Sequence, residues 1–225
     1  MSGYTLTMRI EICGIIASGK TTLASILAAN GYQPVLEKFQ QNPFWAAFFE
    51  DQAKFAFETE ITFLLLHYHQ LKAEAEQNCV CDYSFTQDSA YADLDLEDSK
   101  RKAFTIVQEE IEQELGKPEL IIHLTCAPEI AVQRLRARGR SEENKISLDF
   151  LENLNNAISR RLAEVAQVVK ILVINSSEVD FAKSANDQDA VKSLVQAQLQ
   201  RWLSILSEKC RFQKFGLFTK DFDEQ

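Results

Sequence analysis

The sequence predicts an α/β domain built on a doubly wound, five-stranded parallel sheet with helices on both faces. Short apolar runs alternate with segments of helical period along most of the chain. Strands separated by helices need right-handed crossovers, which make the strands parallel and cover both faces of the sheet. The 225 residues are 46% hydrophobic, which is enough for one buried core. We therefore expect one domain over residues 1–208 and a tail over residues 209–225 that docks on the body or stays mobile.

The apolar runs and the helical periods place the elements in order along the chain. Buried strands are predicted at residues 8–13, 33–37, 79–83, 120–124 and 171–175. Helices are predicted at residues 21–30, 53–77, 97–115, 128–138, 147–168 and 187–208. Gly116 and Pro118 favour the end of a helix just before the fourth strand.

The loop between the first predicted strand and its helix fits the pattern of a phosphate-binding loop. In residues 14–21 two glycines stand five residues apart and are followed by lysine and threonine. Backbone N–H groups of such a loop surround phosphates, and larger side chains would block that approach. Lys20 is expected to reach the β- and γ-phosphates, and the Thr21 hydroxyl to bind Mg²⁺. A nucleoside triphosphate is predicted to contact Gly14, Ser18, Gly19, Lys20, Thr21 and Thr22.

Two carboxylates are predicted to lie beside this loop. Glu37 ends the second predicted strand, and Asp82 lies at the end of the third. In an open α/β sheet ligands bind beyond the carboxyl ends of the strands, so both side chains are expected near the phosphates. One carboxylate can accept the proton of an attacking hydroxyl while the other holds Mg²⁺, directly or through water. The alternative is that both residues only cap strand ends.

Four arginines crowd the end of one predicted helix and the loop after it: Arg134, Arg136, Arg138 and Arg140. They can form a solvated face or complement the negative end of the helix dipole. They can also form a mobile lid that closes over the triphosphate and neutralises the charge of the transition state. Gly139 as a pivot in a polar loop favours the lid.

The charge balance and the cysteine usage limit the partners and the compartment. A net charge of −9 and a pI near 5.0 argue against a nucleic-acid-binding protein, because affinity for the phosphate backbone needs Lys and Arg. No run approaches the roughly 18 apolar residues that span a membrane, so no membrane partner is expected. Five cysteines without metal-type spacing predict a reducing, cytoplasmic setting.

The long aromatic and aliphatic segment at residues 55–71 is predicted to serve packing rather than ligand binding. At helical spacing its apolar residues favour the core or a dimer interface. We therefore expect a homodimer that forms through helical faces.

Several segments together resemble the deoxynucleoside kinase family, which includes deoxycytidine, deoxyguanosine and deoxyadenosine kinases; the bacterial members look closest. The resemblance runs from about residue 8 to residue 182. It is carried by the phosphate-binding loop and then, in order, by residues 36–39, 42–44, 48–51, 82–85 with Asp88, 138–143 and 179–181. The resemblance implies a P-loop kinase fold with an arginine-rich lid.

By this resemblance the chain is an ATP-dependent, Mg²⁺-dependent enzyme that transfers the γ-phosphoryl group to the 5′-hydroxyl of a deoxynucleoside. Glu37 lies where the family has its general base, and Asp82 corresponds to the acidic residue of an Asp/Glu-Arg-Ser motif that helps to hold Mg²⁺. Glu143 falls where a lid carboxylate hydrogen-bonds the sugar 3′-hydroxyl. The lid arginines are matched by Arg134, Arg138 and Arg140. The catalytic residues implied are Glu37, Lys20, Arg138 and Arg140.

Four positions depart from the family pattern. Tyr83 stands in place of the arginine that ordinarily pairs with the base carboxylate, and Gln87 stands where some bacterial relatives have a lysine. Phe49 replaces a tyrosine that contacts the 3′-hydroxyl. Glu60, or Glu58 if the alignment shifts by two, replaces the glutamine that reads the nucleobase edge. The substrate-binding residues expected from the resemblance are Glu37, Phe49, Glu60, Tyr83 and Glu143.

Glu60 suggests a base preference. A glutamine offers one donor and one acceptor, which match adenine or cytosine, whereas a carboxylate offers acceptors only. The N1–H and N2–H₂ donors of guanine match a carboxylate, so a guanine-like purine edge is expected if Glu60 faces the base. The alternative is that Glu60 packs elsewhere.

Two other functions stay open. A nucleoside monophosphate kinase of the thymidylate-kinase type would need an arginine for the acceptor phosphate, and residues 37–57 and 82–95 contain none. Lys38 and Lys54 keep that possibility open. The second is a non-catalytic nucleotide-binding subunit whose substrate pocket has drifted, which the four departures suggest.

Overall fold

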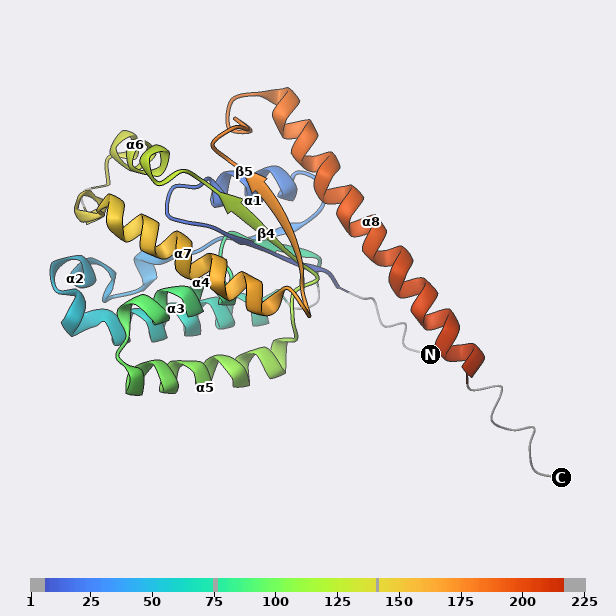
Figure 1. Cartoon of the computed structure of the whole chain (residues 1–225), viewed down its shortest axis with the longest axis horizontal. Coiled ribbons are helices and arrows are strands. Elements are labelled where there is room, and N and C mark those ends of the chain that lie inside the picture. Colours follow the sequence, from blue (N-terminus) through green and yellow to red (C-terminus); the bar gives the residue numbers. More distant parts are fainter. Residues whose placement is uncertain (1–6, 75–76, 141, 217–225) are drawn as a thin grey trace.

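Five parallel strands form one sheet in the order β2-β3-β1-β4-β5, which confirms the predicted architecture (Figure 1). The computed structural model describes residues 7–74, 77–140 and 142–216, with side chains as far as residue 201 except at residues 142 and 144. The strands are β1 (Arg9–Cys13), β2 (Gln33–Val35), β3 (Cys79–Cys81), β4 (Leu120–Thr125) and β5 (Lys170–Asn175). The helices are α1 (Lys20–Ala28), α2 (Trp45–Glu50), α3 (Gln52–Ala73), α4 (Phe85–Asp95), α5 (Asp98–Leu115), α6 (Pro128–Arg138), α7 (Leu148–Val165) and α8 (Ala185–Gly216).

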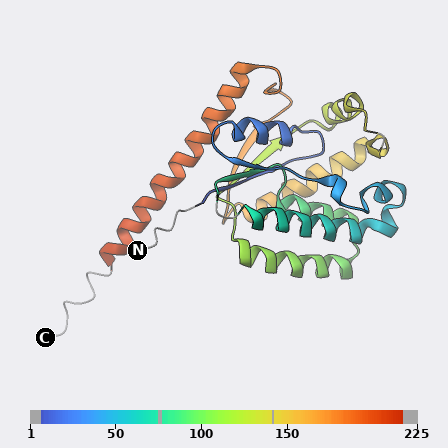
Figure 2. The same cartoon turned by 180° about the vertical axis from the view of Figure 1, so that it is seen from behind.

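The two faces of the sheet carry different helices. Figures 1 and 2 show α1 and α8 on one face, and α3, α4, α5 and α7 on the other. Alternate residues of a strand point to opposite faces. Ile10 and Ile12 of β1 therefore share a buried cluster with residues of α1 and α8, whereas Cys13 shares one with residues of α6 and α7. Both faces are buried, as the continuous apolar runs of parallel strands require.

The strands β2 and β3 end two residues earlier than the sequence predicts. The residues that fall outside the strands include Glu37 after β2, and Asp82 and Tyr83 after β3. In the structure the backbone N–H of Glu37 donates to the Asp82 carboxylate at 2.7 Å instead of continuing the ladder. Both strands therefore end just before Glu37 and Asp82, which line the cavity at the carboxyl ends of the strands.

Two helices, α2 and α4, are missing from the sequence-based assignment. Helix α4 begins after Ser84, whose hydroxyl accepts a hydrogen bond from the backbone N–H of Gln87 at 3.0 Å. Its buried residues include Thr86, Gln87 and Asp88, so its inward face lacks the apolar stripe by which helices are recognised. This face is polar because Gln87 and Asp88 line a cavity at the carboxyl ends of the strands.

The last helix, α8, is longer than predicted. Val191, Val195 and Leu199 are buried against the sheet and α1, which fits the predicted amphipathic face. The helix continues to Gly216, past the predicted end at Glu208, because no proline interrupts this stretch and glycine is a common terminator. Residues 217–225 of the predicted tail lie outside the described residues, as does the lid residue Ser141. Within the described residues, no helix combines the length and the apolar character needed to cross a bilayer.

Candidate active site

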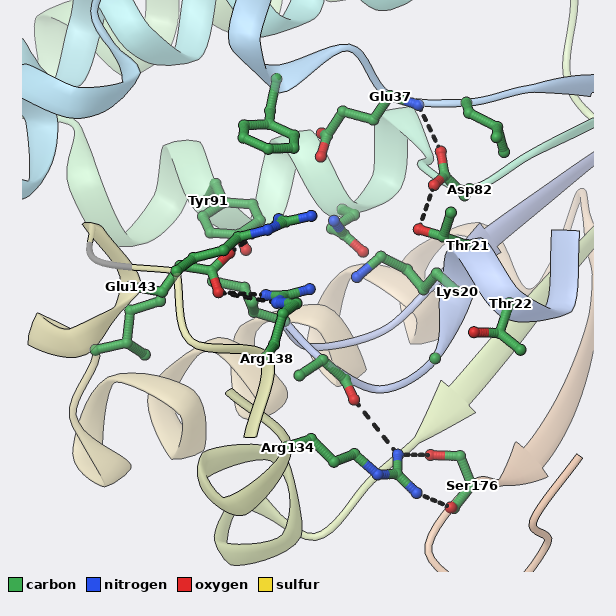
Figure 3. Close-up of a pocket in the computed structure, with 18 of the residues that line it drawn as sticks. Lys20, Thr21, Thr22, Glu37, Asp82, Tyr91, Arg134, Arg138, Glu143 and Ser176 are labelled. Carbon is green, nitrogen blue, oxygen red and sulfur yellow. Dashed lines mark hydrogen bonds and ion pairs between the residues drawn. The ribbon is translucent and has the colours of Figure 1, made fainter. Parts of the chain in front are cut away.

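A cavity of about 750 Å³ opens at the carboxyl ends of the strands (Figure 3). It is bounded by the phosphate-binding loop, α2, α3, α4 and the segment after α6. Most of the side chains predicted from the sequence line it: Gly19, Lys20, Thr21, Thr22, Glu37, Phe49, Glu60, Asp82, Arg134, Arg138, Arg140 and Glu143. Ser18 and Gly14 belong to the loop but do not line the cavity, and Tyr83 is buried behind its wall.

The phosphate-binding loop leads from β1 to the N-terminus of α1, the end of a helix that attracts anions. Lys20 Nζ donates to the carbonyl oxygens of Gly14 at 2.7 Å and Ile15 at 3.1 Å. Burial lowers the pKa of Lys20, which Glu37 partly offsets. A Cβ at Gly14 would lie 2.4 Å from the Leu124 carbonyl oxygen, so only glycine fits there.

Gln87 supports the loop from α4. Its side-chain oxygen accepts the backbone N–H of Gly14 at 3.0 Å, deep in the structure. This position was noted in the sequence only as a departure from the family pattern. The structure gives it a definite contact, namely with the first glycine of the loop.

Asp82 joins the loop to the end of β2. Its carboxylate accepts a hydrogen bond from Thr21 Oγ1 at 2.6 Å and another from the backbone N–H of Glu37 at 2.7 Å (Figure 3). Burial raises the pKa of Asp82, and the Thr21 hydroxyl partly counters that effect. The predicted pair of metal-binding groups, Thr21 and Asp82, is therefore brought into direct contact.

Glu37 projects into the cavity with a side chain that is 36% exposed. One carboxylate oxygen lies 3.2 Å from Nε2 of His67. Burial raises the pKa of Glu37, but the hydrogen bond and charge of His67, together with Lys20 and Arg140, outweigh burial and hold the pKa below its ordinary value. A carboxylate that stays ionised beside the phosphate-binding loop can accept a proton from a bound hydroxyl.

The arginines after β4 divide into two sets. Arg134 turns toward β5, where its Nη2 donates to the Ser176 carbonyl at 2.7 Å. Arg138 and Arg140 both contact Glu143, with nitrogen–oxygen distances of 2.5 Å and 3.1 Å. Arg136, the fourth member of the predicted cluster, does not line the cavity.

Aromatic side chains form the wall opposite the loop. The ring of Phe39 lies 4.8 Å from Trp45, and Trp45 lies 5.1 Å from Phe49 at a steep angle. The Arg140 guanidinium sits 4.4 Å from the centre of the Phe39 ring. Flat apolar walls of this kind suit a planar heterocycle.

Several carboxyl groups lie near Glu60. Glu60 is 5% exposed and lines the cavity, whereas the alternative residue Glu58 does not. Burial raises the pKa of Glu60 well above its ordinary value, and Asp95 and Asp88 raise it further. Burial likewise raises the pKa of Asp95 to about 7.

From the sequence alone, four residues of this region were assigned no role in the site. Gln87, Asp88 and Tyr91 come from α4, and His67 comes from the helix that was assigned to packing. A signal was present, because Glu60 and His67 are seven residues apart and so share one face of α3.

Comparisons with known proteins find similarity to deoxynucleoside kinases. Residues 10–200 match the family model described as deoxynucleoside kinase. The chain is similar to a deoxyadenosine kinase of Dictyostelium discoideum, with 30% identity over 75% of this chain and 72% of the relative. It is similar also to a deoxyguanosine kinase of Bacillus subtilis, with 26% identity over 83% of this chain and 95% of the relative.

Solved structures share the fold. The structure of deoxyadenosine kinase from M. mycoides with bound dCTP superposes with a TM-score of 0.71 at 21% identity, over 86% of this chain and 100% of that chain. The structure of the same enzyme with bound dATP gives a TM-score of 0.69 at 22% identity, over 86% of this chain and 99% of that chain.

Proposed function

The chain belongs to the deoxynucleoside kinase family, whose members are ATP-dependent phosphotransferases, and on this premise we propose that it transfers the γ-phosphoryl group of ATP to the 5′-hydroxyl of a deoxynucleoside. One observation carries the proposal. A single cavity joins a phosphate-binding loop to an aromatic pocket, and a partly exposed carboxylate, Glu37, lies within it. Phosphoryl transfer depends mainly on positioning and charge neutralisation, which this arrangement can supply.

Each charged group has a role in this proposal. Glu37 accepts the proton of the 5′-hydroxyl, and Lys20 holds the β- and γ-phosphates. Arg138 and Arg140 neutralise the charge that spreads over the transferred phosphoryl group, while Arg134 positions the phosphates from the side of β5. All five residues line the same cavity, which supports these roles.

The donor groups of the site fit Mg²⁺. Thr21 and Asp82 offer a hydroxyl and a carboxylate in contact with each other, and Mg²⁺ prefers oxygen ligands. Among the described residues no cluster of three or more His, Cys, Asp or Glu side chains could hold a metal. That finding suits Mg²⁺, which is usually held by one or two protein groups together with phosphates and waters. Thr21 and Asp82 would hold the ion, which would supply positive charge to neutralise the phosphates.

The acceptor is held by the other end of the cavity. Phe49 packs against the nucleoside, Glu60 faces the base and Glu143 receives the sugar 3′-hydroxyl. Tyr83, which the resemblance suggested as a substrate contact, is instead a buried support: its hydroxyl donates to the carbonyl oxygen of His67 at 3.3 Å. The burial of Tyr83 explains why it does not reach the substrate.

The base preference depends on the proton of Glu60, and we expect it to change with pH. Ionised Glu60 offers two acceptors and suits the donor edge of guanine, as the sequence suggested. Protonated Glu60 offers one donor and one acceptor and suits adenine or cytosine. Burial and the nearby carboxylates of Asp95, Asp88 and Glu37 raise the pKa of Glu60, while His67 lowers it, so the protonated form persists to unusually high pH.

The ratio of kcat/KM for deoxyguanosine to that for deoxyadenosine should therefore rise with pH, by about tenfold or more, the cost of one unpaired buried polar group. The sign follows from the pKa, because raising the pH removes the proton and creates the acceptor pair. Glu60→Gln cannot ionise and should give a ratio that does not change with pH, with Glu58→Gln as the matched control. A wild-type ratio that is flat with pH, or a Glu60→Gln ratio that rises with pH as in the wild type, would remove Glu60 from base recognition.

The proposed reaction is tested by incubating the protein with ATP and Mg²⁺ and, in turn, each of the four deoxynucleosides and the four nucleoside monophosphates. Turnover of a deoxynucleoside is expected. Turnover of monophosphates alone would indicate the thymidylate-kinase type, although no arginine stands in the acceptor segments 37–57 and 82–95. ATP binding without turnover would indicate a non-catalytic subunit.

We extend the proposal to a homodimer in a reducing, cytoplasmic setting. Leu65 on α3 and Ile106 on α5 are 48% and 62% exposed, which supports an interface on these helices. The four described cysteines, Cys13, Cys79, Cys81 and Cys126, are free thiols. Light scattering of the purified protein should give twice the chain mass of 25.6 kDa, and a monomeric mass would contradict the dimer.

A further inference from the structure

His67 links two carboxylates of the candidate active site through its two ring nitrogens. Nδ1 lies 2.8 Å from Asp88 Oδ2, and Nε2 lies 3.2 Å from Glu37 Oε1. A neutral imidazole has only one N–H, so it can donate to only one of these carboxylates. An imidazolium donates to both when both carboxylates are ionised, and the two distances fit such a carboxylate–imidazolium–carboxylate bridge.

The ring of His67 is fixed in place by its neighbours. It stacks on Tyr83 with centroids 3.8 Å apart and planes 8° apart, and Phe63 lies 5.9 Å away at 30°. The Tyr83 hydroxyl also donates to the His67 carbonyl oxygen. Asp88 holds the far nitrogen from α4, so the ring presents Nε2 toward Glu37 in one orientation.

The bridge lies behind the wall of the cavity. Glu37 and Asp88 both line the cavity, whereas the side chain of His67 is 2% exposed and does not. His67 therefore has no direct path to a bound substrate and can act only through the carboxylates that it contacts.

The charges around His67 favour the protonated form of its ring. Burial by itself disfavours a charged His67, but Asp88 and Glu37 outweigh that effect and raise its pKa to about 10. Glu60, on the same helix, is a further acidic neighbour, and Lys20 and Arg140 act on Glu37 from the opposite side. The protonated ring of His67 thus supplies one positive charge at a place crowded with acidic groups.

We propose that His67 is a positioning residue, which holds the Glu37 carboxylate in its catalytic orientation and provides its counter-charge, with Asp88 and Tyr83 fixing the imidazole ring. The inference rests on the proposed role of Glu37 as general base. It also accounts for Tyr83, which stands where the family resemblance places an arginine partner for the base carboxylate. Here the cation comes from α3, and Tyr83 serves as the surface on which it stacks.

The kinetic test compares His67→Gln and His67→Arg with His69→Gln, an exposed histidine two residues along the same helix. In His67→Gln the single-turnover rate should fall by about 10²-fold, the effect of a misplaced catalytic group, while KM for ATP and nucleoside stays nearly constant. In His67→Arg, which restores a fixed cation that can stack on Tyr83, much of the rate should return. His69→Gln should match the wild type. An unchanged rate in His67→Gln, or equal losses in the Gln and Arg variants, would overturn the inference.

A second readout does not depend on activity. In ¹⁵N-labelled wild-type protein, histidine side-chain spectra should show both nitrogens of His67 protonated at pH 8, and Glu37→Gln or Asp88→Asn should lower its pKa. The His67→Gln variant assigns the resonance among the three histidines. A neutral His67 at pH 8 would overturn the bridge even in an active kinase. If the wild type phosphorylates no nucleoside, the proposed function fails, and this titration still decides on the bridge.

Discussion

Replacing Glu37 with glutamine is expected to lower kcat for nucleoside phosphorylation by about 10²–10⁴-fold, the usual contribution of a general base. The amide keeps the size of the side chain, but it cannot accept the proton of the attacking hydroxyl. Its oxygen can still accept the hydrogen bond from His67, so the fold should persist. Steady-state and single-turnover rates with the preferred deoxynucleoside give the measurement.

Two comparisons make the Glu37 result decisive. Glu129→Gln, an exposed substitution at the start of α6, should leave kcat unchanged. Nucleotide affinity of Glu37→Gln should stay close to that of the wild type, because phosphate contacts come from the loop. A kcat within about twofold of wild type would exclude Glu37 as the base, since loss of a general base costs at least about 10²-fold.

The second large effect is expected from Lys20→Met. Lys20 is the cation closest to the loop, where its ammonium group is bound by the carbonyl oxygens of Gly14 and Ile15. Methionine fills a similar volume but brings no charge to the phosphates. Because charge builds up on the transferred group in the transition state, kcat should fall by about 10²–10³-fold.

The kinetic parameters distinguish two explanations for Lys20. A fall in kcat means that Lys20 acts mainly in the transition state, whereas a rise in KM for ATP alone means equal binding of ground and transition states. Lys102→Met on the exposed side of α5 is the matched control and should behave as the wild type. An effect limited to KM would contradict the proposed role.

The sheet was predictable from the sequence because its strands are short apolar runs that alternate with segments of helical period. Helix α6 was predicted with the same bounds, 128–138, since proline starts it and glycine follows it. Helix α4 was missed because its buried face is polar. The Ser84 and Gln87 spacing, which is that of a capping box, marked its start and could have been used.

Site residues were predictable where a local sequence pattern marks them. They were not predictable where only the packing of distant segments brings them together. The phosphate-binding loop, Glu37 and Asp82 follow from glycine spacing and from the position of strand ends. His67 could not be recognised as a partner of Glu37, because the contact depends on how α3 packs against the loop after β2. Tyr83 was expected at the substrate, but stacking on His67 buries it.

The position of β1 at the centre of the sheet also orders the events of chain synthesis. Arg9 pairs with Cys79, and Ile10 pairs with Leu120, so β1 is synthesised 70 and 110 residues before the residues with which it pairs. Loop closure over such distances is slow, and until it happens both edges of β1 stay unpaired. The phosphate-binding loop that follows β1 therefore takes its final shape only after β4 has been made.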